Sequence, residues 1–108
     1  MSRRYTVIWA NTAYADLLDI VEYIAKDSPA TAGKILQNIK SKAADLTVSP
    51  QRGRVVPELQ EQGITLYREL IIDPWRLIYR ITDATVLVFS VIDGRQNVED
   101  ILLRRLVK

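Results

Sequence analysis

The sequence ITLYRELIIDPWRLIYRITDATVLVFSVI, residues 64–92, contains three runs of β-branched, aliphatic and aromatic residues. Two-residue spacers, Asp73-Pro74 and Asp83-Ala84, separate the runs, and each begins with Asp, which is common in turns. Connections this short join antiparallel neighbours. The stretch therefore predicts a three-stranded antiparallel meander with strands at about 64–72, 75–82 and 85–92.

The chain before the meander predicts one strand followed by two helices. Residues 5–9 have the β-branched and aromatic character of a short strand, and Asn11 or Thr12 is expected to cap the next helix. Apolar residues then recur at helical spacing over 13–26 and again from Ser28-Pro29 to about residue 47. Because Ser28 suits an N-cap and Pro29 the first helical position, the two segments predict an antiparallel helical hairpin.

The remaining segments predict a loop and a terminal helix. Residues 49–57 contain two prolines and a glycine and show no periodicity, which indicates a loop. After an Asp93-Gly94 turn, Asn97 is the expected N-cap of a helix with acids in its first turn and arginines near its end. The fold class is thus α+β, and 108 residues are enough for one domain, 1–108.

The composition excludes several kinds of chemistry. Histidine and cysteine are both absent, so serine or cysteine nucleophiles activated by histidine are excluded, as is nearly every zinc site. We expect no cofactor and no metal. No apolar run approaches the roughly 18 residues of a membrane span, and the first five residues lack the apolar core of a secretory signal. These features predict a cytoplasmic protein.

The meander has two faces of different character. Counting outward from the turns places Trp75, Leu77, Tyr79 and Ile81 on one face with Val86, Val88 and Ile92, and this face is expected to meet the helical hairpin. The opposite face carries cationic and apolar side chains: Arg76, Ile78 and Arg80, flanked by Tyr67, Glu69 and Ile71 and by Leu87, Phe89 and Val91.

Two interpretations of the opposite face remain open. The terminal helix can cover its apolar part through the stripe Val98, Ile101, Leu102 and Leu106, or a partner peptide or second copy can do so. Likewise, Arg76 and Arg80 can pair with acids such as Glu69, or they can line an anion-binding groove. Eight of the ten arginines lie at or after Arg52, which favours an anionic partner for this half of the chain.

Several segments together resemble the RelE/ParE toxin superfamily, and most closely its ParE or plasmid-stabilisation branch. The resemblance spans nearly the whole chain and rests on the order and spacing of five segments: 13–25 (AYADLLDIVEYIA), 49–54 (SPQRGR), 68–70 (REL), 75–81 (WRLIYRI) and 91–95 (VIDGR). It implies the toxin of a type II toxin-antitoxin system, in which a ParD-like or similar antitoxin silences the toxin in a hetero-oligomer.

The resemblance also implies two alternative targets. RelE-type toxins cut mRNA on the ribosome, whereas ParE-type toxins poison DNA gyrase. The RelE-type catalytic arginines fall on Arg76 and Arg95, but its lysines fall near Tyr67 and Glu69 and its tyrosine near Ile101. An acid in place of a cation argues against stabilisation of a scissile phosphate, so a non-enzymatic gyrase poison is favoured. The alternatives are a ribosome-dependent endoribonuclease and a non-toxic nucleic-acid-binding domain.

Each alternative has its own candidate residues. The gyrase or anion-binding candidates are Arg76, Arg80, Arg95, Arg104 and Arg105. The nuclease candidates are Arg76, Arg95, Arg54 and Arg68, although the strand count turns Arg68 to the other face. The antitoxin is expected to be a partly disordered peptide that lays apolar side chains on the sheet or the helical hairpin. Its candidate contacts are Leu87, Phe89, Val91, Ile101 and Leu102.

Overall fold

The computed structural model describes residues 4–107; the outermost residues of the predicted 1–108 domain, 1–3 and 108, lie outside the described residues. The fold is α+β, as predicted, and the meander belongs to a five-stranded sheet of order β1-β5-β4-β3-β2. The elements in chain order are β1 Thr6–Trp9, α1 Asn11–Ala25, α2 Pro29–Ala44, a 3-10 turn η1 Asp45–Thr47, β2 Arg54–Val55, α3 Pro57–Gln60, β3 Tyr67–Ile72, β4 Trp75–Thr82, β5 Thr85–Asp93 and α4 Val98–Leu106.

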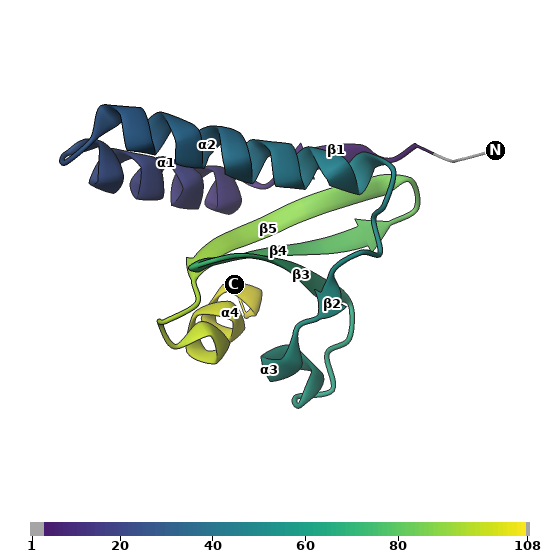
Figure 1. The fold of residues 1–108 in the computed structure, drawn as a ribbon. Coiled ribbons are helices and arrows are strands. Elements are labelled where there is room, and N and C mark those ends of the chain that lie inside the picture. The colour runs from purple at the N-terminus through teal and green to yellow at the C-terminus, as the bar shows by residue number, and fades with distance from the viewer. Residues whose placement is uncertain (1–3, 108) are drawn as a thin grey trace.

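The sheet lies between two helical layers (Figure 1). The hairpin of α1 and α2 covers one face, where Leu17 and Ile39 pack with Leu77, Tyr79 and strand β5 in one apolar core. The short helices α3 and α4 lie on the opposite side of the sheet. They form a second core there, whose buried residues are Val56, Leu59, Tyr67, Ile78, Ile92, Val98 and Leu102. Both faces of the sheet therefore carry packed side chains.

The strand register agrees with the prediction between β3 and β4 but not throughout β5. Ile72 lies opposite Trp75 and Thr82 opposite Thr85, as expected for two-residue turns. Within β5, however, Ile78 faces Ser90 while Tyr79 faces Val88, so a β-bulge leaves Phe89 without a partner. One inserted residue reverses the alternation of every side chain beyond it.

The bulge makes two face assignments wrong. Val91, predicted on the face opposite the hairpin, is buried in the hairpin-side core. Ile92, predicted to meet the hairpin, belongs to the second core under α4. The other hairpin-side assignments on β4 and β5 are confirmed, including Leu77, Tyr79 and Val88.

The remaining differences concern element boundaries. The predicted 49–57 loop contains strand β2, and Pro57 opens helix α3, which the prediction missed. Strand β3 begins at residue 67 and not at 64. The first helix has Ala10 at its N-cap without a side-chain bond, so the predicted capping by Asn11 or Thr12 is wrong. The caps by Ser28 and Asn97 are confirmed, since each side chain accepts a backbone N–H of its helix.

Within residues 4–107, none of the helices has the length and apolar character needed to cross a membrane.

Candidate functional site

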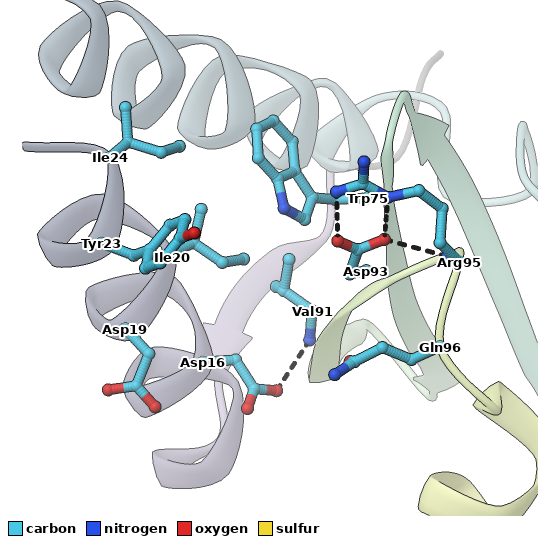
Figure 2. Close-up of a pocket in the computed structure, with 10 residues that line it drawn as sticks. All are labelled: Asp16, Asp19, Ile20, Tyr23, Ile24, Trp75, Val91, Asp93, Arg95 and Gln96. Atoms are coloured by element: carbon cyan, nitrogen blue, oxygen red, sulfur yellow. Dashed lines mark hydrogen bonds and ion pairs between the residues drawn. The ribbon is translucent and has the colours of Figure 1, made fainter. Parts of the chain in front are cut away.

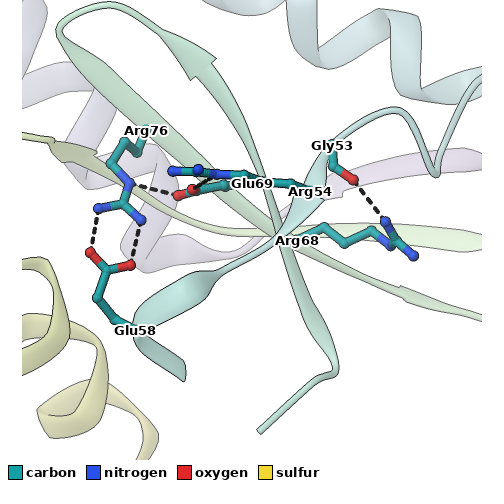
Figure 3. Close-up of polar contacts among 6 residues, drawn as sticks. All are labelled: Gly53, Arg54, Glu58, Arg68, Glu69 and Arg76. Carbon is teal, nitrogen blue, oxygen red and sulfur yellow. Dashed lines mark hydrogen bonds and ion pairs between the residues drawn. The ribbon is translucent and has the colours of Figure 1, made fainter. Parts of the chain in front are cut away.

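A buried carboxylate joins three strands and a helix on the second face of the sheet. Glu69 of β3 is 1% exposed. Its two oxygens accept hydrogen bonds from Arg76 Nε of β4 at 2.6 Å and from Arg54 Nε of β2 at 2.7 Å. Arg76 also donates through both terminal nitrogens to the carboxylate of Glu58 in α3, at 2.7 and 2.6 Å. Figure 3 shows these four side chains as one connected ion network.

The network is electrically balanced, with two guanidinium groups and two carboxylates. Hydrogen bonds from Arg76 lower the pKa of Glu58, and hydrogen bonds to Glu58 and then Glu69 raise the pKa of Arg76. The Arg76 side chain is only 11% exposed. The pairing of Arg76 with Glu69 that the sequence allowed is therefore present, and this arginine is already compensated inside the chain.

Hydrogen bonds from Tyr79 and Arg68 connect loop 49–53 to the meander. The Tyr79 hydroxyl donates to the carbonyl of Pro50 at 2.7 Å and accepts from the Gly53 N–H at 3.0 Å, while Arg68 donates to the Gly53 carbonyl at 2.7 Å. A Cβ atom at Gly53 would lie 2.4 Å from the backbone oxygen of Glu69, so this close approach requires glycine. Burial raises the pKa of Tyr79. Arg68 thus holds the loop, on the face opposite Arg76 as the strand count indicated.

Arg105 connects the terminal helix to the first helix. It donates to both carboxylate oxygens of Asp16, at 2.7 and 2.9 Å, and to Ser90 Oγ at 2.7 Å. The backbone N–H of Val91 also donates to Asp16, at 2.9 Å. Because Asp16, Ser90 and Arg105 belong to α1, β5 and α4, this cluster fixes α4 relative to the rest of the fold. Arg105 was predicted to bind a partner, and its structural role in this cluster was not predicted.

The other arginines predicted to bind anions are more accessible. Arg95 and Arg104 have side chains 77% and 75% exposed, and they pair with Asp93 and Asp100, respectively. The bidentate contact with Arg95 lowers the pKa of Asp93 to about 2. Arg80 lies on the same sheet face as Arg76, donates weakly to the Thr82 hydroxyl at 3.3 to 3.4 Å, and has no ion pair with a carboxylate of the described residues.

The predicted antitoxin contacts divide into buried and half-buried residues. Leu102 and Val91 are buried in the two cores. Phe89 and Ile101 are half-buried and pack against the second core, where the ring centroids of Phe89 and Tyr67 lie 5.3 Å apart. Helix α4 therefore supplies much of the cover on this face, which was one of the two predicted possibilities. Leu87 is half-buried on β5, and Ile8, its partner on the edge strand β1, is exposed.

Asp16 also lines a pocket of about 390 Å³, which lies between α1, the start of β4 and the end of β5. Figure 2 shows Tyr23 and Trp75 on its walls, Asp19 on one rim and the Asp93–Arg95 pair on the other. The sequence pattern gives no sign of this site, because its residues come from three separate segments and carry no common spacing.

The five-stranded sheet, the helical hairpin on one face and the short helices on the other define the fold of the RelE/ParE superfamily. In solved structures, the chromosomal ParDE toxin-antitoxin system of P. aeruginosa shares this fold, with a TM-score of 0.70 and 23% identity over 85% of this chain and 98% of that chain. The toxin-antitoxin complex RelBE2 of Mycobacterium tuberculosis matches with a TM-score of 0.57 and 28% identity, covering 83% and 98% of the two chains.

The chain belongs to the ParE toxin family of type II toxin-antitoxin systems. Residues 7–98 match the model of that family, described as the ParE toxin of the parDE system. Toxin RelE2 of Caulobacter vibrioides is 31% identical over 80 residues, which cover 74% of this chain and 84% of that protein. The family assignment made from sequence segments is thereby confirmed.

Proposed function

We propose that this toxin acts by binding DNA gyrase, without catalysing a reaction of its own, and that a cognate antitoxin neutralises it in the cytoplasm. The antitoxin part of the proposal is supported by the two structural neighbours, which are described as a ParDE system and a RelBE2 complex. The choice of gyrase over mRNA depends on the chemistry available on the second face of the sheet.

The main support for gyrase over mRNA is the burial of Glu69 and its pairing with two arginines. An RNA-cleaving site must present cations to the scissile phosphate and a group that transfers protons. At this position the chain has a buried carboxylate that binds both Arg54 and Arg76. A phosphate approaching Arg76 would compete with two carboxylates for one guanidinium and would be repelled by both. The arrangement stabilises the sheet and is poorly suited to phosphoryl chemistry.

The accessible arginines support binding to a large partner. Arg80, Arg95 and Arg104 retain exposure, and a planar guanidinium on an accessible surface suits contacts with carboxylates or phosphates. Arg80 has no carboxylate partner among the described residues, and the surface ion pairs of Arg95 and Arg104 can exchange with a partner at little cost, because solvent screens exposed pairs. We therefore assign gyrase contacts to these three residues and structural roles to Arg76 and Arg105.

Ribosome-dependent mRNA cleavage is the second candidate function. It is favoured by the Caulobacter relative, which is called Toxin RelE2. It is also favoured by the exposure of Arg95, which stands at the position of one of the RelE-type catalytic arginines. In this alternative Arg54 and Arg95 would contact RNA.

An assay with gyrase, ATP and supercoiled plasmid tests the proposal. We expect gyrase-linked linear DNA to accumulate with the purified toxin, and Arg80→Gln to reduce it while Lys34→Gln on the exposed side of α2 does not. Codon-specific mRNA cuts in a translation reaction, without linear DNA, would establish the second candidate instead. If neither product forms and expression without antitoxin does not slow growth, the chain is a non-toxic nucleic-acid-binding domain.

For the antitoxin, the apolar strip beside α4 is the proposed contact. Leu87 and Phe89 are half-buried on β5 and next to the exposed Ile8 on β1. We expect Leu87→Asp to weaken co-purification of the antitoxin encoded beside the toxin while leaving the circular dichroism spectrum unchanged. Equal recovery of antitoxin with a folded Leu87→Asp variant would remove this strip from the interface.

A further inference from the structure

The pocket beside α1 is lined by apolar, aromatic and charged side chains. Ile20 and Ile24 of α1 and Val91 of β5 line it from within, and the Trp75 ring at the start of β4 borders it. Tyr23 projects from α1 with 71% of its surface exposed. An exposed tyrosine beside a half-buried tryptophan offers two aromatic surfaces to an incoming group, and such surfaces attract cations.

The charges of the pocket favour a cation. Asp16 is compensated from behind by Arg105, and Asp93 is compensated at the rim by Arg95. Asp19 also lines the pocket, and its carboxylate has no ion pair with any residue in the described part of the chain. The rim thus has one acid without a counter-charge, which Figure 2 shows on α1 next to Tyr23, with Trp75 on the far side of the pocket.

We propose that this pocket receives an arginine or lysine side chain of the antitoxin peptide. The alkyl stem of such a side chain can pack against the apolar residues Ile20, Ile24 and Val91. Its cationic head can interact with the Asp19 carboxylate and with the aromatic rings of Tyr23 and Trp75. A nucleic acid is a poor occupant, because its phosphates would meet the uncompensated carboxylate. This inference rests on the proposed antitoxin partner and gives that partner a specific anchor, separate from the strip formed by Leu87 and Phe89.

A peptide titration tests the pocket without requiring gyrase or the antitoxin. The probe is acetyl-Ala-Leu-Arg-Leu-Ala-amide, its glutamine counterpart is the control peptide, and spermidine represents a free cation. The 15N-labelled toxin is made by cell-free synthesis and followed by NMR. We expect saturable, millimolar shifts at the amides of Asp19 and Tyr23 and at the indole N–H of Trp75, with the arginine peptide binding at least about fivefold more tightly than the glutamine peptide.

Matched variants identify the residue responsible. Asp19→Asn should weaken binding of the arginine peptide about threefold or more and reduce its salt dependence, whereas Glu22→Gln removes the same charge from an exposed site on the same helix outside the pocket and should leave binding unchanged. Tyr23→Ala, also exposed, should weaken binding as well. Equal affinity for the two peptides, equal affinity of wild type and Asp19→Asn, or stronger binding of spermidine would each overturn the proposal.

The same variants separate this proposal from the proposed function. If the antitoxin co-purifies equally with wild type and Asp19→Asn, the pocket is not its anchor, although the toxin-antitoxin pairing stands. If the peptide binds in the pocket but no antitoxin associates with the toxin, the proposed partner is wrong and the pocket belongs to another basic peptide.

Discussion

Arg105 of α4 and Asp16 of α1 lie 89 residues apart in sequence, yet two N–H···O bonds of 2.7 and 2.9 Å join their side chains. Both side chains are mostly buried, and Asp16 also accepts the backbone N–H of Val91. Removal of Asp16 would therefore leave the Arg105 guanidinium with Ser90 Oγ but without its carboxylate, and would take away the side-chain acceptor of the Val91 N–H. This contact adds a polar link between α4 and α1 to the apolar packing of Val98 and Leu102 in the second core.

We expect Asp16→Ala to lower the free energy of unfolding by about 2–3 kcal/mol, because it leaves the mostly buried Arg105 without its counter-charge and removes the acceptor of the Val91 N–H. Arg104→Ala is the matched control on the same helix, since Arg104 forms an exposed pair and its loss should cost less than about 1 kcal/mol. Urea denaturation followed by circular dichroism measures both values. Equal effects of the two variants would show that the Asp16–Arg105 contact stabilises the fold no more than the exposed Asp100–Arg104 pair does.

Glu69→Gln should destabilise the fold by about 2–4 kcal/mol, because it leaves the buried Arg76 with reduced compensation. Glu58→Gln should cost less, since the Glu58 side chain retains 31% exposure and solvent can replace part of the lost interaction. Thermal unfolding of the two variants under identical conditions gives the comparison. A larger loss for Glu58→Gln would mean that α3, and not β3, provides the essential charge.

The glycines Gly53 and Gly33 should respond oppositely to alanine. A Cβ at Gly53 would lie 2.4 Å from a backbone oxygen and 2.6 Å from the Tyr79 hydroxyl oxygen, so Gly53→Ala must displace the 49–53 loop and should destabilise strongly. A Cβ at Gly33 meets nothing within 4 Å, and the residue lies inside α2. Gly33→Ala should therefore stabilise the chain by about 0.5–1 kcal/mol, as measured by its urea midpoint.

Acid should remove the contribution of Asp93. Its pKa in the folded chain is about 2, held down by hydrogen bonds from Arg95, and the unfolded-state value is near 3.9. The stabilisation of the fold by the Asp93–Arg95 contact is therefore fully present above about pH 4 and is lost as the pH falls through about 2. Denaturation midpoints at several pH values in this window should fall more steeply for wild type than for Asp93→Asn. The same acid slope in both proteins would contradict the assignment.

The sequence predicted those features that are encoded locally. The two-residue turns placed Ile72 opposite Trp75, and the residue types at Ser28 and Asn97 identified both confirmed caps. The pairing of Arg76 with Glu69 could also be predicted from the sequence, because cross-strand neighbours follow from the register.

The features that escaped prediction have non-local causes. Strand β5 is apolar on both faces, so its sequence pattern gave no sign of the bulge at Phe89 that turns Val91 toward the hairpin. The second partner of Arg76, Glu58, comes from a four-residue helix too short for periodicity to reveal. The partner of Asp16, Arg105, could not be found from helical spacing, because the two residues lie 89 positions apart in sequence.

The parallel pairing of β1 with β5 has a consequence for synthesis of the chain. Thr6 lies opposite Thr85 and Trp9 opposite Val88, so β1 has no partner strand in this sheet until β5 has been synthesised. Translation at about 5–20 residues per second delays that meeting by several seconds. During this interval the sheet of the nascent chain is unfinished, and the five-stranded form exists only after β5 has been synthesised.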